Sequence, residues 1–231
     1  MPSGCLARPR VAAVPLPKTG SGVGGEVVRA MDRPEADEVR KMSMDVLGSG
    51  LCDAGHHEDA LSVQEAMLSM VRRLGEPEEN ILSVQANLAR TYAKVGRPLE
   101  ALCIERDIYS AHVKIHGEAH ENTLISALNC ASSLNRLQRF KEAKSLMRKM
   151  IPVARRVVGE YDETTIRIKW TYTLALYSDD RATLGDLHEA VTTLEDVEPI
   201  ARRVFGGAHP LTKGMEESLQ VARAALAARE T

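Results

Sequence analysis

The sequence predicts an all-α fold, a right-handed superhelical solenoid of antiparallel helix pairs with about four repeats and a C-terminal capping helix. The main observation is a marker glycine followed by a short polar stretch, which recurs at Gly75, Gly117, Gly159 and Gly206 with spacings of 42, 42 and 47 residues. A fixed period in this range is typical of proteins in which one helical unit stacks on the next. Such a stack offers an extended surface and no obvious catalytic pocket, which favours binding over catalysis.

A second recurring motif divides each cycle into two helices. Glu100–Ala101 recurs 42 and then 47 residues later as Glu142–Ala143 and Glu189–Ala190, and an earlier copy stands at Asp59–Ala60. Over residues 140–158 the apolar residues follow the 3.6-residue spacing of one helix face. We therefore expect a first helix that starts after each marker glycine and a second helix that runs from the Glu-Ala pair to the next marker glycine.

The marker glycines also predict where the second helices end. A glycine just past a helix end suits the left-handed cap conformation, and Arg155 and Arg156 complement the negative helix end before Gly159. Pro152 and its match Pro199 lie inside the second helices, where a proline bends the helix axis. Their recurrence predicts a bend that the two helices share.

The two ends of the array are expected to differ from its middle. The first helix of the first unit, within residues 41–55, holds Gly48 and Gly50, and an internal glycine costs about 1 kcal/mol, so we expect this helix to fray. The five extra residues of the last cycle are expected within residues 179–186. A helix over about residues 211–229 carries polar residues along one side and is predicted to cap the stack.

Two strings of the sequence resemble the tetratricopeptide repeat. They are NLARTYAKVGRPLEAL, which begins at Asn87, and its echo NCASSLNRLQRFKEAK, which begins at Asn129. Ala89 and Ala101 keep the spacing of twelve between the small residues of the two helices in that repeat. The 42-residue period and the Gly-x-x-His-x-x-Thr linker at residues 206–212 resemble the kinesin light chain type of this repeat. The resemblance covers most of the chain and implies a scaffold that binds other proteins.

The resemblance also implies a binding surface. In that family the first helices line a concave groove, and an asparagine two residues before the small position clamps a peptide backbone. Asn87 and Asn129 hold this place, whereas Thr171 in the third unit and Val46 in the first unit replace it. An asparagine amide can donate to a peptide carbonyl and accept from its N–H together. The residues predicted to form the peptide-binding groove are Ser83, Asn87, Arg90, Lys94, Asn129, Ser132, Arg136, Arg167 and Thr171.

Three histidines form a pattern that suggests a metal site. His112, His116 and His120 are four residues apart, and the first two could share a helix face as metal ligands. Gly117 lies between the second and the third, so the helix is expected to end there, and His120 stands at the linker position of His209. We therefore interpret these side chains as solvated or capping histidines, and we predict no metal, cofactor or catalytic residue.

Composition limits the class of partner. The formal net charge is -2 and the 231 residues include one Trp, five Tyr and two Phe, so the chain lacks the basic surface and the stacking platforms of nucleic-acid-binding proteins. No run of about 18 apolar residues predicts a membrane span. The four cysteines show no C-x-x-C pairing and are interpreted as core residues in a reducing compartment, which favours the cytoplasm.

The start of the chain differs from the rest. Residues 1–33 are rich in glycine and proline and are predicted to be a flexible tail, while residues 34–231 are predicted to form the tetratricopeptide-like repeat domain. The basic character of this tail leaves import into an organelle as an alternative to the cytoplasm.

We expect the chain to be a scaffold without enzymatic activity that binds an extended or helical peptide segment of a partner in its concave groove. For the asparagines, the alternative is that they bond between neighbouring repeats or face water. For the chain, the alternative is a structural or self-associating solenoid, a homodimer that stacks through its terminal repeats. The weak first helix and the methionines at Met42, Met44, Met67 and Met70 suggest this second function.

Overall fold

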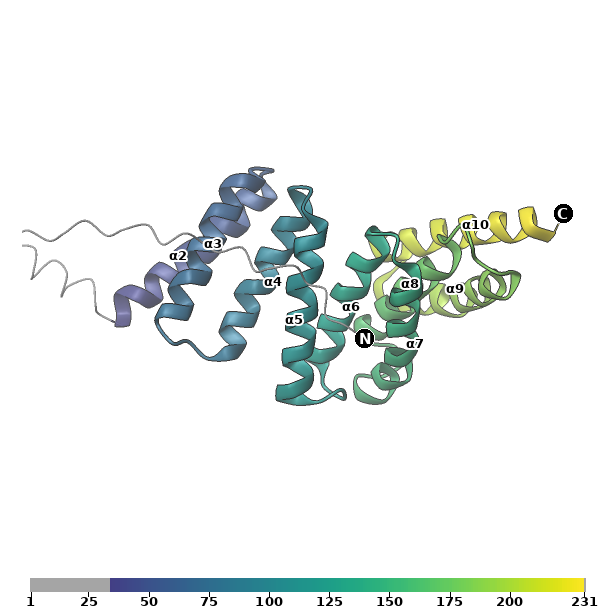
Figure 1. The fold of residues 1–231 in the computed structure, drawn as a ribbon. Coiled ribbons are helices and arrows are strands. Elements are labelled where there is room, and N and C mark those ends of the chain that lie inside the picture. Colours follow the sequence, from purple (N-terminus) through teal and green to yellow (C-terminus); the bar gives the residue numbers. More distant parts are fainter. Residues whose placement is uncertain (1–33, 231) are drawn as a thin grey trace, which may run out of the picture. The chain divides into compact units, whose positions relative to one another are not determined.

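A computed structural model describes residues 34–230, and the predicted tail over residues 1–33 lies outside the described residues (Figure 1). Within residues 34–230 every regular element is a helix, and the described chain has no strand. The predicted all-α class is therefore confirmed. The chain divides into two compact units that meet between Thr91 and Tyr92, so one continuous repeat domain over residues 34–231 stays a prediction.

The first unit takes its residues from three helices. They are α2 (Pro34–Asp53), α3 (His57–Arg73) and α4 (Glu78–Lys94). The first two pack along each other, and a small core joins Met67 and Val71 of α3 to Val84 of α4. At the end of α2 the Cys52 sulfur lies 3.6 Å from the Thr91 hydroxyl oxygen. The unit thus begins with the helix pair that the sequence predicts.

The two internal glycines of α2 have different surroundings. The helix is continuous over both of them, which differs from the predicted fraying. A Cβ atom on Gly48 would lie 3.1 Å from Cγ of Gln64, so this glycine allows α2 to approach α3 closely. A Cβ atom on Gly50 would meet nothing within 4 Å. Gly48 is therefore a packing residue, whereas Gly50 only weakens the helix.

The second unit continues the alternation of first and second helices. Its elements are α5 (Pro98–His116), α6 (Glu121–Arg136), α7 (Phe140–Val157), α8 (Glu163–Tyr177), α9 (Leu184–Phe205) and α10 (Pro210–Glu230). Each of these helices packs against the next, and α8 also contacts α6 and α10 (Figure 1). Because α6, α8 and α10 are first helices, the first helices of successive repeats lie side by side.

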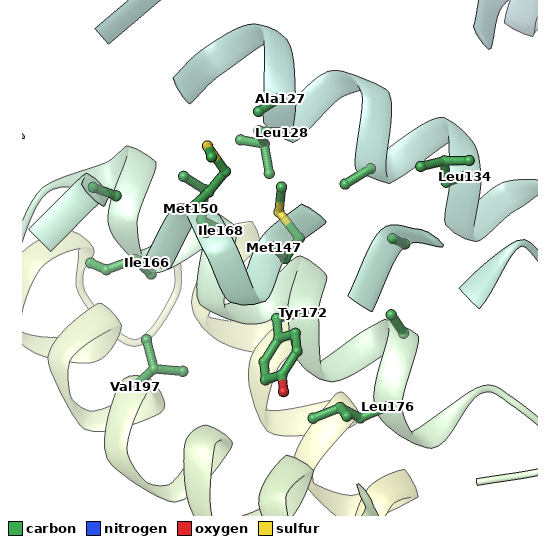
Figure 2. Packing of buried hydrophobic residues seen from close by; sticks show 14 of the residues in the cluster. Ala127, Leu128, Leu134, Met147, Met150, Ile166, Ile168, Tyr172, Leu176 and Val197 are labelled. Carbon is green, nitrogen blue, oxygen red and sulfur yellow. The ribbon is translucent and has the colours of Figure 1, made fainter. Parts of the chain in front are cut away.

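The core of the second unit depends on a repeated pattern in the second helices. Figure 2 shows the side chains from α6, α7, α8 and α9 that fill this core. In α7 and α9 an alanine is followed by large apolar residues four and seven positions later and by another alanine eleven positions later. We call this pattern the second-helix stripe, and all its members are fully buried: Ala143, Met147, Met150 and Ala154 in α7, and Ala190, Leu194, Val197 and Ala201 in α9.

The linkers at Gly117, Gly159 and Gly206 share one construction, whereas the linker at Gly75 has Ile81 in place of the threonine. The marker glycine ends the second helix with a positive φ, which is 82° at Gly117 and 89° at Gly206. A buried threonine six residues later donates its hydroxyl to the glycine carbonyl. These bonds join Thr123 to Gly117 at 2.7 Å, Thr165 to Gly159 at 2.7 Å and Thr212 to Gly206 at 2.9 Å.

The residue three positions after each of these glycines caps the next first helix. Its side chain accepts a hydrogen bond from a backbone N–H two residues later, as an N-cap residue does. The bonds join Asn122 to His120 at 3.2 Å, Thr164 to Asp162 at 2.7 Å and Leu211 to His209 at 3.2 Å. The interpretation of His120 as a capping histidine is confirmed.

The last cycle differs from the others as the sequence predicts. Its extra residues lie partly in the connection between α8 and α9, residues 178–183 against 137–139 between α6 and α7, and partly at the start of α9, which begins six residues before Ala190 whereas α7 begins three before Ala143. Helices α7 and α9 continue past Pro152 and Pro199, and the shared bend of these helices stays a prediction.

Polar contacts hold α10 against its neighbours. Trp170 of α8 donates its indole N–H to the Ser218 hydroxyl at 2.9 Å, and a Cβ atom on Gly214 would lie 2.8 Å from the Trp170 ring. Arg229 donates to two carbonyl groups of residues 178–183, at 2.7 and 2.9 Å. Arg229, one of the polar residues of the predicted capping helix, therefore fastens this helix to the array.

The two glycines of α2 provide a matched pair of substitutions. Gly50→Ala is expected to raise the free energy of unfolding by about 0.5–1 kcal/mol, because alanine favours the helix and meets no neighbour. Gly48→Ala is expected to lower it, because the new methyl group presses on Gln64. Urea denaturation followed by circular dichroism measures both, and equal effects of the two changes would contradict this account.

The threonine bond of the linker can be tested with a substitution of similar shape. Thr165→Val is expected to lower the free energy of unfolding by about 1–3 kcal/mol, because the half-buried Gly159 carbonyl loses the hydroxyl donor of the buried Thr165. Thr192→Val, at an exposed position of α9, is the control and is expected to change stability by less than about 0.5 kcal/mol. Thermal unfolding of both variants would show whether the linker bond stabilises the repeat.

Candidate peptide-binding surface

The exposed face of α6 carries Asn129 toward solvent. The helix buries Leu124, Leu128 and Ala131 on its other side, which turns Asn129 outward. No described residue makes a hydrogen bond to the Asn129 amide. Ile125, one turn earlier on the same face, is 41 % exposed. This face therefore combines an amide that can donate and accept with an apolar contact area.

Asn87 of α4 has a different environment. Its amide nitrogen donates to the Asp45 carboxylate at 3.2 Å, and its amide oxygen accepts from the Arg90 guanidinium at 2.8 Å. Asp45 is the neighbour of Val46, which holds the matching place on α2, since the buried Gly48 and Cys52 stand 41 residues before the buried Ala89 and Ala93. Asn87 thus bonds between neighbouring repeats, as the alternative interpretation expected.

The last turn of α6 ties that helix to the first helices beside it. Arg136 donates to the Ala93 carbonyl at 2.9 Å, and Asn135 donates its amide N–H to the Thr171 carbonyl at 3.0 Å. Both bonds satisfy backbone carbonyl groups that lie on another first helix. The Arg136 guanidinium therefore has a structural partner as well as an exposed position.

The other residues of the predicted groove are placed as follows. The hydroxyl groups of Ser83 and Ser132 each donate to a backbone carbonyl one turn earlier in their own helix. Arg167 lies 3.4 Å from a carboxylate one turn earlier on α8. Thr171 is buried, and Lys94 is exposed. Within the second unit the open part of the surface thus includes Asn129 with Ile125 on α6, Arg167 on α8 and Lys94.

Glu105 of α5 is an ionisable group that the sequence analysis missed. Its Oε2 atom is buried, and no described residue makes a hydrogen bond to it. Burial raises the pKa of the Glu105 carboxyl from 4.5 to about 7, which the Ser133 hydroxyl and the charge of Arg136 oppose only in part. Burial and this carboxyl together raise the pKa of the Cys130 thiol to about 11. The only sign of this group in the sequence is that Glu105 stands 42 residues before Met147, so a carboxyl occupies the position at which α7 has a buried apolar residue.

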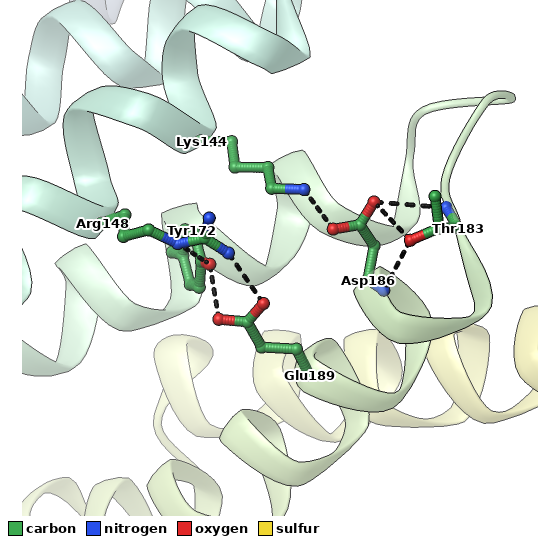
Figure 3. Close-up of polar contacts among 6 residues, drawn as sticks. All are labelled: Lys144, Arg148, Tyr172, Thr183, Asp186 and Glu189. Carbon is green, nitrogen blue, oxygen red and sulfur yellow. Dashed lines mark hydrogen bonds and ion pairs between the residues drawn. The ribbon is translucent and has the colours of Figure 1, made fainter.

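The second helices are joined by a ladder of ion pairs (Figure 3). Arg148 of α7 lies 2.9 Å from the Glu189 carboxylate of α9, and Tyr172 donates its hydroxyl to the same carboxylate at 2.6 Å. One repeat earlier, Arg106 lies 2.6 Å from Glu142. The recurring glutamate of the Glu-Ala motif thus pairs with an arginine of the preceding second helix. Exposed pairs contribute about 0–1 kcal/mol each, so they favour a register more than they add stability.

The three histidines are close in space but already have structural contacts. The rings of His116 and His120 stack with centroids 4.2 Å apart, and His120 caps α6. Within residues 34–230, no group of three His, Cys, Asp or Glu side chains could hold a metal ion. The same part of the chain has no helix that is long and apolar enough to cross a membrane.

Comparison with known families adds a direct observation on residues 123–163. This segment, which runs from α6 through α7 to the start of α8, matches the tetratricopeptide repeat family. Residues 123–163 therefore carry a tetratricopeptide repeat, as the sequence resemblance predicts. The linker threonines Thr123 and Thr165 stand at the start of this repeat and of the next one.

Solved structures show the same tetratricopeptide fold. Two crystal structures of a kinesin light chain-type protein from Podosopora anserina, with nearly identical TPR-like repeats, match at TM-scores of 0.69 and 0.68 and 20 % identity. The matches cover 83 and 87 % of this chain and 88 and 91 % of those chains. BtubC from P. vanneervenii matches at a TM-score of 0.64 and 15 % identity, over 89 % of this chain and 85 % of that chain. Curated protein sequences give no match.

Glu105 predicts a dependence of stability on pH. The folded chain keeps the Glu105 proton up to a pKa of about 7, whereas the unfolded chain loses it near 4.5, so this group stabilises the fold below pH 4.5 and the contribution is lost as the pH rises through 7. Glu105→Gln is expected to flatten this fall and to be more stable than the wild type at pH 8 by about 1–2 kcal/mol.

Urea denaturation at several pH values measures this difference. Asp107→Asn, an exposed change on the same helix, is the control variant. If Glu105→Gln and the wild type lose stability in parallel between pH 4.5 and 8, the buried carboxyl is not the cause.

Proposed function

We propose that the chain is a protein-interaction scaffold without enzymatic activity, which binds an extended or helical peptide segment of a partner on the exposed faces of its first helices. The observation that carries this proposal is the solvent-facing Asn129 amide, which no described residue engages. The tetratricopeptide family consists in general of protein-interaction scaffolds, which supports the coarser part of the proposal. The finer part, a grip on the peptide backbone, rests on Asn129.

The chemistry of this surface favours a peptide backbone over a single charged group. The Asn129 amide can donate to one peptide carbonyl and accept from one peptide N–H, so recognition there tolerates different side chains. Ile125 supplies apolar contact beside it, and Arg167 on α8 supplies a positive charge. Thr171, at the matching place on α8, is buried. We therefore propose that the peptide backbone binds mainly to α6.

The compartment is part of the same proposal. Cys52 and Cys130 are free thiols, and both are buried. Free core cysteines are typical of a reducing compartment, which supports the cytoplasm.

A second candidate function is self-association through the terminal repeats. The specific observation in its favour is on α2, where Val39, Met42 and Val46 are exposed although they are apolar. Sedimentation velocity at several chain concentrations distinguishes a monomer from a dimer that forms through this helix.

The binding test starts from peptides selected on the immobilised chain from a phage-displayed random library. Fluorescence anisotropy then measures the affinity of each selected peptide for the wild type and for variants. Asn129→Ala is expected to weaken binding about tenfold, because the peptide loses its amide partner. Asn87→Ala is the matched control, since the Asn87 amide is engaged within the chain, and it is expected to change the affinity less than about twofold.

Circular dichroism confirms that both variants remain helical. If Asn129→Ala leaves the affinity unchanged, or if Asn87→Ala has the larger effect, the peptide does not bind where we propose.

A further inference from the structure

The second-helix stripe takes a different form in α5. Its first and third places hold apolar residues, whereas its second and fourth places hold ionisable ones, so that the four residues are Ala101, Glu105, Ile108 and His112. In the other second helices of the same unit the second place is fully buried, as Met147 in α7 and as Leu194 in α9. A carboxyl group therefore stands in α5 where the next two repeats have a large apolar side chain.

The packing of α5 against α6 leaves this carboxyl only partly satisfied. On the α6 side Glu105 meets the Ser133 hydroxyl, which hydrogen-bonds to it, the charge of the Arg136 guanidinium and the Cys130 thiol. Its Oε2 atom is buried, and no described residue makes a hydrogen bond to it. A buried carboxylate oxygen without a donor disfavours the ionised form.

The cations of this layer have other partners. Arg136 donates to the Ala93 carbonyl at 2.9 Å. Arg106, which hydrogen-bonds to the Cys130 thiol, lies 2.6 Å from the Glu142 carboxylate of α7. An ionised Glu105 would therefore have to compete for Arg136 with a backbone carbonyl group, and for Arg106 with another carboxylate.

Helix α5 is also less deeply buried than the helix that follows it. Three of its residues are buried, Ala101, Leu102 and Ile108, against nine residues of α6. Segments with few buried apolar side chains open at a lower free energy than the whole unit does. The contact between α5 and α6 is thus the place where a local opening of the second unit is expected first.

We propose that α5 and α6 form a pH-gated layer, in which ionisation of Glu105 favours a locally open state that admits water to Glu105 and Cys130 while α7, α8 and α9 stay packed. In the packed layer Glu105 keeps its proton up to a pKa of about 7, and in the open layer it loses it near 4.5. Above pH 4.5 the open state binds fewer protons, so opening becomes more favourable as the pH rises and levels off above 7. Between pH 6 and pH 8 the opening equilibrium is expected to rise about tenfold.

The Cys130 thiol reports on this opening, because it is 2 % exposed and lies beside Glu105. The native full chain is labelled with iodoacetamide at pH 6, 7 and 8, and peptide mass spectrometry gives the labelling rate at Cys130. Division by the rate in the urea-unfolded chain at the same pH removes the effect of thiol ionisation. This ratio is expected to rise about tenfold from pH 6 to pH 8. The buried Cys52 of the first unit is the internal control and is expected to change less than about threefold.

Substitutions at Glu105 test whether its carboxyl is the cause. Glu105→Met, which introduces the residue of the matching place in α7, and Glu105→Gln, which keeps the shape of the side chain, are each expected to hold the ratio within about twofold. Asp107→Asn, an exposed change on the same helix, is expected to keep the tenfold rise. His112 is present in every variant, so its own titration cannot produce a difference between them. A wild-type ratio that does not change with pH, or a rise that both Glu105 variants retain, would overturn the proposal.

Hydrogen exchange separates a local opening from unfolding of the whole unit. After correction for the intrinsic exchange rate at each pH, the backbone amides of α5 are expected to lose about tenfold in protection from pH 6 to pH 8. The amides of α8 are expected to keep their protection within about twofold. If α8 loses protection in parallel with α5, the unit unfolds as a whole and the local opening is wrong.

Discussion

The whole array depends on one packing constraint, which is that each first helix must bury one face against the second helix that precedes it. In α6 this face includes the small residue Cys130, which lies beside Glu105 and Arg106 of α5, whereas in α8 it includes Ile168 and Tyr172. The second-helix stripe meets these faces with alanines at both ends and larger residues in its middle. Because such interiors are close-packed, a change of one methylene group on either helix alters the packing of both helices and lowers the stability of the fold. The apolar residues recur every 42 residues in the sequence because each repeat must make the same helix contacts.

The polar groups are arranged around this packed face and have separate tasks. Between second helices, ion pairs such as Arg148 with Glu189 fall at the edge of the buried stripe and favour one register of neighbouring repeats. Between first helices, Asn135 and Arg136 satisfy backbone carbonyl groups. Asn129 lies opposite the packed face and takes part in neither arrangement. The surface that is available for a partner is thus what remains after the repeats have been joined.

Local features of the sequence predicted the fold and the helix ends well. The helix ends at the marker glycines and the capping role of His120 depend only on residues a few positions apart in the chain, so the local sequence was sufficient to predict them. The partners of Asn87 and Glu105 could not be predicted in this way, because they depend on which residue of a neighbouring helix lies opposite. The first cycle shows the difficulty: the 41-residue spacing from Gly55 to Gly96 places Val46 opposite Asn87, yet the Asn87 amide bonds to the neighbouring Asp45.

The two end helices of the described chain have opposite chemistry, and this contrast argues for a function of the first. In α10 polar side chains pair with α9, as Arg223 does with Glu195, and Val221 is the one large apolar side chain that this helix exposes. On α2, by contrast, Val39, Met42, Val46 and Leu47 are all exposed although they are apolar. Since a buried position favours apolar residues and an exposed one does not, this face has the composition of an interface rather than of an end.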